Sequence, residues 1–188
     1  MAVQNYNDQH GHLPPAVVYS EDGQPLYSWR VLILPYIEQS DLYSQFNLDE
    51  PWDSPNNIRL LDKMPKSYAV PTRKSNRVPP YHTICHVLVG PGTAFESQQQ
   101  LRLEGDFPDG LSNTLLIVEA GEPVPWTKPD ALIFDPDGPL PELRTIFKDD
   151  FRVCMADGSV RFVRKSISEK TLRAAITRNG KDMLGPDW

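Results

Sequence analysis

The segment Phe151-Arg-Val-Cys-Met-Ala-Asp-Gly-Ser-Val-Arg-Phe-Val163 carries the clearest secondary-structure signal in this sequence. Two β-prone runs flank Asp157-Gly158, and a two-residue Asp-Gly loop between such runs is typical of a β-hairpin. A type I′ turn needs a positive φ angle at both central positions, which glycine adopts freely and aspartate more readily than most residues. The sequence therefore predicts a hairpin with Asp157 and Gly158 as its structural turn.

The two arms of this hairpin differ in their pattern of apolar residues. In the second arm Val160 and Phe162 alternate with polar residues, which predicts one apolar face and one solvated face. In the first arm the run 153–156 is apolar on both faces. We therefore expect the hairpin to lie inside a sheet, with a further element covering its apolar face.

Length and composition are those of an ordinary soluble globular protein. The chain has 188 residues, of which 39% are hydrophobic and 23% charged, enough for one domain with its own core. Its 19 prolines favour ordered loops and short elements over a helical bundle. The net charge of -6 argues against a nucleic-acid surface, which needs a basic stripe. No apolar run approaches the length of a membrane span, and no signal peptide is recognisable.

The first eleven residues predict a helix. Val3, Tyr6 and His10 fall at helical spacing, and Gly11 is a natural C-terminal stop. Because a helix this short is marginal in isolation, we interpret it as the end of a longer helix whose earlier turns precede Met1. A frayed N-terminus is the alternative.

Three further short helices are expected between residues 12 and 80. Their predicted spans are 28–38, 40–46 and 54–65. Ser28 and Ser54 are suitable N-cap residues for the first and the third. Pro35 is expected to kink the first helix, since proline removes a backbone hydrogen bond. A strand over residues 31–34 is the alternative for that segment.

The second half of the chain changes to β-strands. After a polar connector at 71–80, strands are predicted at 82–89, 114–119 and 131–134, the last as an edge strand between prolines, and the hairpin adds two more. A final helix is expected to begin at Ser168, with Ile167 and Leu172 as a hydrophobic staple, and to end at Asn179-Gly180. Helices first and strands later predict the α+β fold class with an antiparallel sheet.

These elements predict one globular domain over residues 1–188. Its expected parts are the end of an N-terminal helix (1–11), a helical and loop insertion (12–80), the antiparallel sheet (81–165), and a C-terminal helix with its tail (166–188).

Two groups of residues are candidate metal ligands. His82 and His86 are four residues apart, but on a strand their side chains lie roughly 13 Å apart, too far to share a metal. Asp135 and Asp137, in Asp135-Pro-Asp-Gly138, resemble the beginning of a calcium loop but lack its later acidic ligands. The alternative for this segment is a plain Asx-type turn. Calcium is the only cofactor that the sequence suggests.

Neither the tryptophans nor the carboxylates form a recognisable catalytic arrangement. Trp52 and Trp126 lie in proline-rich loops, where they either bind a ligand or pack the loops onto the core. Glu119 and Glu122 follow a predicted strand end, as catalytic acids often do, but no nucleophile and base accompany them. We therefore assign no catalytic residue and expect a protein that is not an enzyme.

Several blocks of the sequence share one resemblance. They are Asn5-Tyr-Asn-Asp-Gln-His-Gly-His-Leu-Pro-Pro15, Ala156-Asp-Gly-Ser-Val-Arg-Phe162, and residues 28–39, 50–57, 91–95, 109–114, 118–120 and 124–129. Together they resemble a large planctomycete family of prepilin-like proteins with a domain of unknown function. The resemblance covers essentially the whole chain from Ala2.

In that family the domain follows a prepilin-type leader with a cleavage and methylation site and one hydrophobic helix. The resemblance implies a membrane-spanning helix upstream of Met1 and a pilin- or pseudopilin-like fold, with the N-terminal helix packed on the sheet. It implies a structural assembly subunit of a type II secretion or type IV pilus-like apparatus, anchored in the cell envelope and extracytoplasmic. Its partners would be other pilin-like subunits or components of that apparatus. The alternative is an extracytoplasmic module that binds carbohydrate or another polymer through Trp52 and Trp126.

The sequence departs from the family pattern at two positions. Phe147 stands where the family often has a histidine, so no role of that histidine carries over. Val70 stands where a cysteine is frequent, so no family disulfide carries over either. Cys85 and Cys154 are either paired or buried as free thiols.

Overall fold

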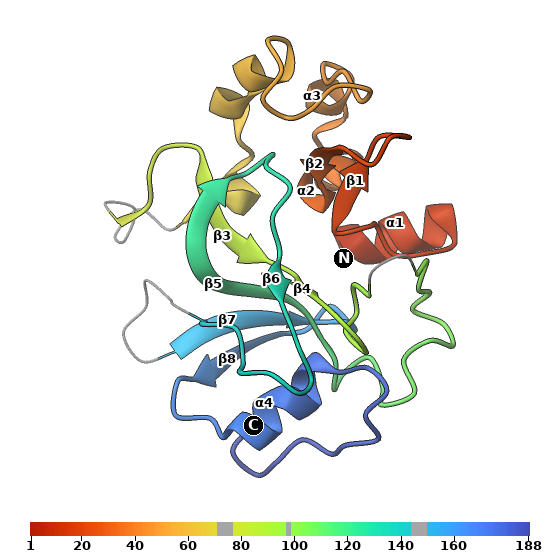
Figure 1. The fold of residues 1–188 in the computed structure, drawn as a ribbon, viewed down its shortest axis with the longest axis vertical. Helices are drawn as coiled ribbons and strands as arrows, with labels where there is room; N and C mark the ends of the chain where they lie inside the picture. Colours follow the sequence, from red (N-terminus) through yellow and green to blue (C-terminus); the bar gives the residue numbers. More distant parts are fainter. Residues whose placement is uncertain (71–76, 97–98, 144–149) are drawn as a thin grey trace.

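The computed structural model describes residues 1–70, 77–96, 99–143 and 150–188. Its elements are α1 (Ala2–His10), β1 (Val17–Tyr19), β2 (Pro25–Ser28), α2 (Trp29–Leu32), η1 (Leu34–Ile37), α3 (Ser40–Tyr43), η2 (Asn57–Lys63), η3 (Lys66–Tyr68), β3 (His82–His86), β4 (Leu88–Val89), β5 (Leu115–Pro125), β6 (Leu132–Ile133), β7 (Asp150–Met155), β8 (Val160–Arg164) and α4 (Glu169–Ile176), where η denotes a 3₁₀ helix. Short helices precede most of the strands, and one helix follows them (Figure 1). The fold is therefore mixed α and β with antiparallel sheets, as the sequence predicts.

The largest sheet has the strand order β3-β5-β7-β8, and all its neighbouring strands are antiparallel. Opposite residues in such a sheet direct their side chains to the same face. Val118 lies opposite Val153, and Phe151 lies opposite Val163, so these four side chains share one face, here named the inner face. Helix α4 packs against it, below the sheet in Figure 1.

The inner face forms one of two hydrophobic clusters. It brings together buried residues of the sheet and of α4, namely Leu115, Val118, Phe151, Val153, Met155, Val163, Leu172 and Ile176. Ser168 starts α4 as predicted, because its Oγ accepts a hydrogen bond from the N–H of Thr171. Ile167 packs against the same cluster as Leu172, in agreement with the predicted staple.

The hairpin forms, but its turn is not the predicted two-residue type I′ turn. Gly158 has a φ of 86°, whereas Asp157 is not among the non-glycine residues with positive φ. The N–H of Gly158 donates to the carbonyl of Met155 (2.9 Å), and the N–H of Met155 donates to the carbonyl of Ser159 (2.9 Å). The loop is thus residues 156–158, a type I turn followed by a left-handed glycine. The Asp157 carboxylate accepts hydrogen bonds from the N–H and Oγ of Ser159, which holds Asp157 out of the left-handed region.

The apolar side chains of β8 face the opposite way from the expectation. Val160 and Phe162 lie opposite Cys154 and Arg152, on the face of the sheet away from α4, here named the outer face. They are 62% and 70% exposed, whereas Val163 is buried on the inner face. The side chains of β8 do alternate between two faces, but the expectation that the Val160 and Phe162 face is covered is wrong, because α4 packs on the side of Val163.

Helix α1 has the predicted span and ends at Gly11, whose φ is 77°. Its Val3 and Tyr6 belong to the second hydrophobic cluster, which gathers the N-terminal segments around Trp29 and Leu34. The amide of Gln4 donates to the carbonyl of Ala156 (3.1 Å), so α1 meets the sheet at the hairpin loop and not across a face. Within the described residues, no helix has both the length and the apolar character needed to cross a membrane.

The predicted helices of the N-terminal half form, but in shorter pieces. The segment 28–38 divides into α2 and η1 just before Pro35, so the strand alternative for 31–34 is wrong. Ser28 accepts from the N–H of Arg30 as its cap. The segment 54–65 contains η2, a 3₁₀ helix that begins at Asn57, two residues later than predicted. Ser54 is therefore not its N-cap, although its Oγ accepts from the N–H of Asn57 (3.1 Å).

Three boundaries in the C-terminal half differ from the prediction. The strand expected at 82–89 divides at Val87, and β4 then pairs in parallel with β6. Strand β5 continues to Pro125, six residues beyond its predicted end. Helix α4 stops at Ile176 because Thr177 is extended and pairs with Thr93. Residues 71–76 of the predicted connector lie outside the described residues, as does Phe147.

Candidate functional site

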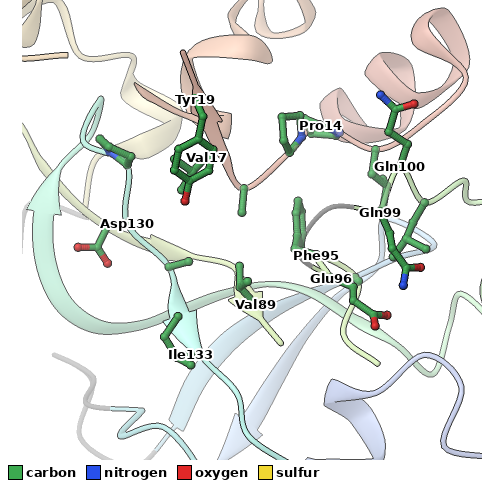
Figure 2. A pocket seen from close by; sticks show the side chains of 17 residues that line it. Pro14, Val17, Tyr19, Val89, Phe95, Glu96, Gln99, Gln100, Asp130 and Ile133 are labelled. Atoms are coloured by element: carbon green, nitrogen blue, oxygen red, sulfur yellow. The ribbon is translucent and has the colours of Figure 1, made fainter. Parts of the chain in front are cut away.

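A cleft of about 760 Å³ lies between the N-terminal segments and the β4–β6 pair (Figure 2). Residues 13–17 and Tyr19 form one wall, while Val89 and Ile133 belong to the other. The cleft brings together segments that lie more than one hundred residues apart in the sequence. Several lining residues belong to blocks that carry the family resemblance, namely 13–15, 94–95 and Pro129, but no single block predicts a cleft, because its walls come from distant segments.

The cleft combines an apolar floor with a polar rim. Leu13, Ala94, Phe95 and Leu101 are buried in its floor, and Tyr19, Glu96, Gln99, Gln100 and Asp130 supply polar groups. Glu96 pairs with Arg178 (2.5 Å), and Asp130 lies 3.8 Å from the ammonium group of Lys128. Because both carboxylates have a cation beside them, the cleft offers hydrogen bonds with little net charge. Such a lining suits a neutral polar ligand with an apolar face.

Asp130 also borders a second, smaller pocket of about 470 Å³, which contains His86. The Nε2 of His86 lies 3.0 Å from the carbonyl oxygen of Glu122, so Nε2 carries the ring hydrogen and donates it. Its Nδ1 is buried without a hydrogen-bond partner in the described part of the chain, and Oδ1 of Asp130 is 3.9 Å away. Burial, helped by the charge of Arg30, lowers the pKa of His86 to about 4, so the ring is neutral near pH 7.

Glu119, one of the two candidate acids, lies in the middle of β5 and not at a strand end. Its carboxylate accepts two hydrogen bonds from the guanidinium of Arg152, at 2.7 and 2.6 Å. Burial raises the pKa of Glu119, and Arg152 opposes that rise. The pair lies on the outer face, and Glu122 is in another part of the strand, so the two acids do not form a catalytic pair.

A buried arginine is the strongest polar feature that sequence reasoning missed. The Arg30 side chain is buried, and its Nε donates to the carbonyl of Cys85 (2.9 Å), as does Nη2. Its Nη1 donates to Oγ of Ser28 (3.2 Å), and its carbonyl accepts from the hydroxyl of Tyr68 (2.8 Å). Because β3 is an edge strand, Arg30 covers a carbonyl that would otherwise remain open to pairing.

The tryptophans do not form an exposed platform. Trp126 is buried, stacks on Tyr68 with ring centroids 5.8 Å apart, and donates from Nε1 to the carbonyl of Leu61 (3.1 Å). Trp52 is half-buried and packs against the N-terminal cluster. Trp126 therefore presents no ring face to a ligand, and loop packing, the alternative weighed from the sequence, describes it.

The segment of the calcium candidates Asp135 and Asp137 forms an Asx-type turn. Oδ1 of Asp135 accepts from the N–H of Asp137 (3.0 Å). The guanidinium of Arg173 donates to the carbonyls of Asp135, Pro136 and Gly138. A positive charge thus occupies the loop oxygens that a calcium ion would use. In the described segments, no group of three or more His, Cys, Asp or Glu residues is arranged to hold a metal ion.

Cys85 and Cys154 are free thiols. They lie on β3 and β7, which flank β5, and strands two positions apart are separated by about 9.5 Å. A disulfide requires a much shorter Cα separation. Burial raises the pKa of the Cys154 thiol, and the nearby α-amino group of Met1 partly offsets that rise.

The fold and its sites define a mixed α/β domain with an open sheet face and a lined cleft. The chain belongs to the family described as "Protein of unknown function (DUF1559)", whose model matches residues 1–136. No curated protein matches the sequence, and no solved structure matches it.

Proposed function

We propose that this chain is the extracytoplasmic domain of a pilin- or pseudopilin-like envelope protein and acts as a structural assembly subunit, not as an enzyme. The observation that carries the proposal is the outer face of the sheet. There Val160 and Phe162 remain exposed on an edge strand, a position where large apolar side chains favour contact with another polypeptide.

The position of α1 supports the same proposal. Gln4, in its first turn, donates to the carbonyl of Ala156 in the hairpin loop, so α1 begins close to the end of the strand that carries Val160 and Phe162. In a pilin-like subunit, a membrane-spanning helix leads into α1 and anchors the domain at the envelope. Neighbouring subunits of a pilus or secretion apparatus would then meet the domain through its outer face.

The test uses the full-length protein in cells that express it. Replacing Val160 and Phe162 together by glutamate leaves the fold intact, because both side chains are exposed. We expect the wild type in the envelope fraction within complexes larger than one subunit, and the double variant in the same fraction without them. Ile133→Glu, which is also exposed but lies in the cleft, is the matched control and should retain the complexes. Complexes of unchanged size in the double variant, or wild-type protein outside the envelope, would contradict the proposal.

The cleft favours a second candidate function, the binding of a neutral oligosaccharide or similar polymer. Its rim provides the hydroxyl of Tyr19 and the amides of Gln99 and Gln100 above an apolar floor. A glycan array followed by calorimetry tests it, with an expected loss of at least tenfold in affinity in Tyr19→Ala. Phe162→Ala, on the outer face, should bind like the wild type. An array without a reproducible ligand argues against this function.

A further inference from the structure

Nδ1 of His86 and Oδ1 of Asp130 are two hydrogen-bond acceptors 3.9 Å apart. The carbonyl of Glu122 can only accept, so Nε2 of His86 must donate and Nδ1 is left with a bare lone pair. The Asp130 carboxylate, whose Oδ1 is 3.9 Å away, is also an acceptor. Two acceptors this close in a partly buried pocket are satisfied by a shared donor such as water, or by a cation bound to both.

The environment of the histidine is the one that metal-ligating histidines have. Such a histidine generally donates its second ring N–H to a carbonyl or carboxylate, which fixes the tautomer and aims the free nitrogen at the metal. In this chain Glu122 provides that carbonyl. The side chain of His86 is only 1% exposed, so its orientation is set by packing.

The distance between the two acceptors fits a shared divalent cation. With metal–ligand bonds of about 2.1 Å, two ligands are about 3.4 Å apart at a tetrahedral angle and about 4.2 Å apart when they face each other across the metal. The observed 3.9 Å between Nδ1 of His86 and Oδ1 of Asp130 falls between these limits.

The charged groups around the pocket are of both signs, and in the described part of the chain no ion pair with a lysine or arginine uses Oδ1 of Asp130. Glu122 and Glu142 line the same pocket, and each has an interaction partner of its own. Among the described residues, two cations are nearby. Lys128 approaches Oδ2 of Asp130 and not Oδ1, and Arg30, whose charge also acts on His86, donates to the carbonyl of Cys85.

We propose that His86 Nδ1 and Asp130 Oδ1 bind a divalent transition-metal cation of the Zn²⁺ class, with water completing its coordination. Imidazole nitrogen and carboxylate oxygen are ligands that zinc commonly takes. Two protein ligands give a weaker site than the three or four of permanent zinc sites, so the cation exchanges with solvent. The site is independent of the assembly function proposed above.

The test is a titration of the purified, chelator-treated protein with Zn²⁺. Calorimetry should give one Zn²⁺ per chain, and the ¹⁵N signal of His86 Nδ1 should shift as the metal is added. Asp130→Asn, which keeps the shape of the side chain, should weaken binding at least tenfold. His86→Asn should abolish Zn²⁺ binding. Because His86 is buried, the affinity of Asp130→Asn alone decides the test if the His86 variant does not fold.

Two sets of control variants separate this site from other histidines. His82→Asn alters the same strand at its half-exposed end and should bind Zn²⁺ like the wild type. His10 and His12, whose rings are 6.3 Å apart, form the main competing location, and His10→Asn with His12→Asn should also leave binding unchanged. Binding weaker than about 1 mM, binding that survives Asp130→Asn, or binding lost in the His10 and His12 variant would overturn the proposal.

Discussion

Gly158 is the residue on which the hairpin loop depends most directly. Its φ of 86° is in the left-handed region, where a β-branched side chain is strained. A Cβ at this position would also lie 3.0 Å from the side-chain oxygen of Gln4, which bonds the loop to α1. The residue therefore links the backbone geometry of the loop to the packing of the N-terminal helix.

We expect Gly158→Val to lower the free energy of unfolding by about 1–3 kcal/mol. Gly158→Asn should lower the free energy of unfolding clearly less, because asparagine tolerates the left-handed conformation. Chemical denaturation of the two variants and the wild type measures the difference. Equal losses in both variants would mean that strain at Gly158 does not limit stability.

Arg30 is the second residue whose role can be tested singly. Its guanidinium bonds the Cys85 carbonyl and Ser28 Oγ at the same time, a geometry that an ammonium group cannot reproduce. We expect Arg30→Lys to destabilise the protein by about 2–4 kcal/mol, because a buried carbonyl loses a partner and a buried charge remains. Thermal and urea unfolding measure the loss, with the exposed Arg102→Lys as the control. A loss below about 0.5 kcal/mol in Arg30→Lys would contradict this role.

The sequence predicted some of these residues and not others, for identifiable reasons. Gly158 was predictable because its role depends on the four residues around it. Arg30 was not, since its partners come from β3 and from the segment preceding α2, and a lone arginine beside apolar residues normally marks a solvated position. Trp126 was ambiguous for the same reason, because its partners Tyr68 and Leu61 are distant in sequence.

Helix α4 is the element whose start is best explained by sequence. Ser168 Oγ accepts from the N–H of Thr171, and Asp187 accepts from the N–H of Ser168 and from the hydroxyl of Thr171. These hydrogen bonds lower the pKa of Asp187 to about 2, with the bond from Thr171 contributing most. The C-terminal tail thus completes the cap of α4.

Ser168→Ala should cost about 1 kcal/mol of stability, the usual effect of losing an N-cap side chain. Ser166→Ala, two residues earlier and outside the helix, is the matched control and should change stability by less than about 0.5 kcal/mol. Far-ultraviolet circular dichroism during urea unfolding follows both variants. Equal stability of Ser168→Ala and the wild type would show that the tail alone caps the helix.

The sequence predicted which helices and strands form better than it predicted where each begins and ends. The hairpin, α1 and α4 have strong local signals, namely a turn, a terminal glycine and a capping serine. The predicted strand 114–119 ends too early. Glycine and proline normally end a strand, yet Gly121, with a φ of 97°, lies within β5. The division of 82–89 was unpredictable, since it depends on the pairing of β4 with β6.

For the whole molecule, the buried His86 makes stability depend on pH. Its pKa of about 4 in the folded protein is below the ordinary value of about 6.5, so the unfolded chain binds this proton first as pH falls. The contribution is fully present above pH 6.5 and is lost between about pH 6.5 and 4, by up to ~3 kcal/mol. Glu119, whose pKa is raised by burial, acts in the opposite direction.

Unfolding free energies at several pH values, in the presence of a chelator, measure this effect. The difference between the wild type and His86→Gln isolates the histidine, because the contribution of Glu119 is common to both. We expect that difference to change steadily between pH 6.5 and 4 and to be constant above pH 7. A difference that is constant over the whole range would show that His86 titrates normally.

The overall architecture was predictable only at the level of fold class. The order of elements indicates α+β, because local signals give each element its type. The sequence could not show which face of the sheet is covered, because Val160, Phe162 and Val163 are all apolar. The position of α4 determines that Val163 is the buried one. The cleft and the His86–Asp130 pocket likewise arise from contacts between distant segments.

The central claim is that the outer face of the sheet contacts other subunits in the envelope. Its most direct test places a photo-cross-linking amino acid at Phe162 of the full-length protein in living cells, with Met183, which is 89% exposed in the C-terminal tail, as the control position. We expect light-dependent products larger than one subunit from position 162, containing further copies of this chain or other pilin-like proteins, and none from position 183. Position 162 yielding only uncross-linked monomer, or the same products as position 183, would contradict it.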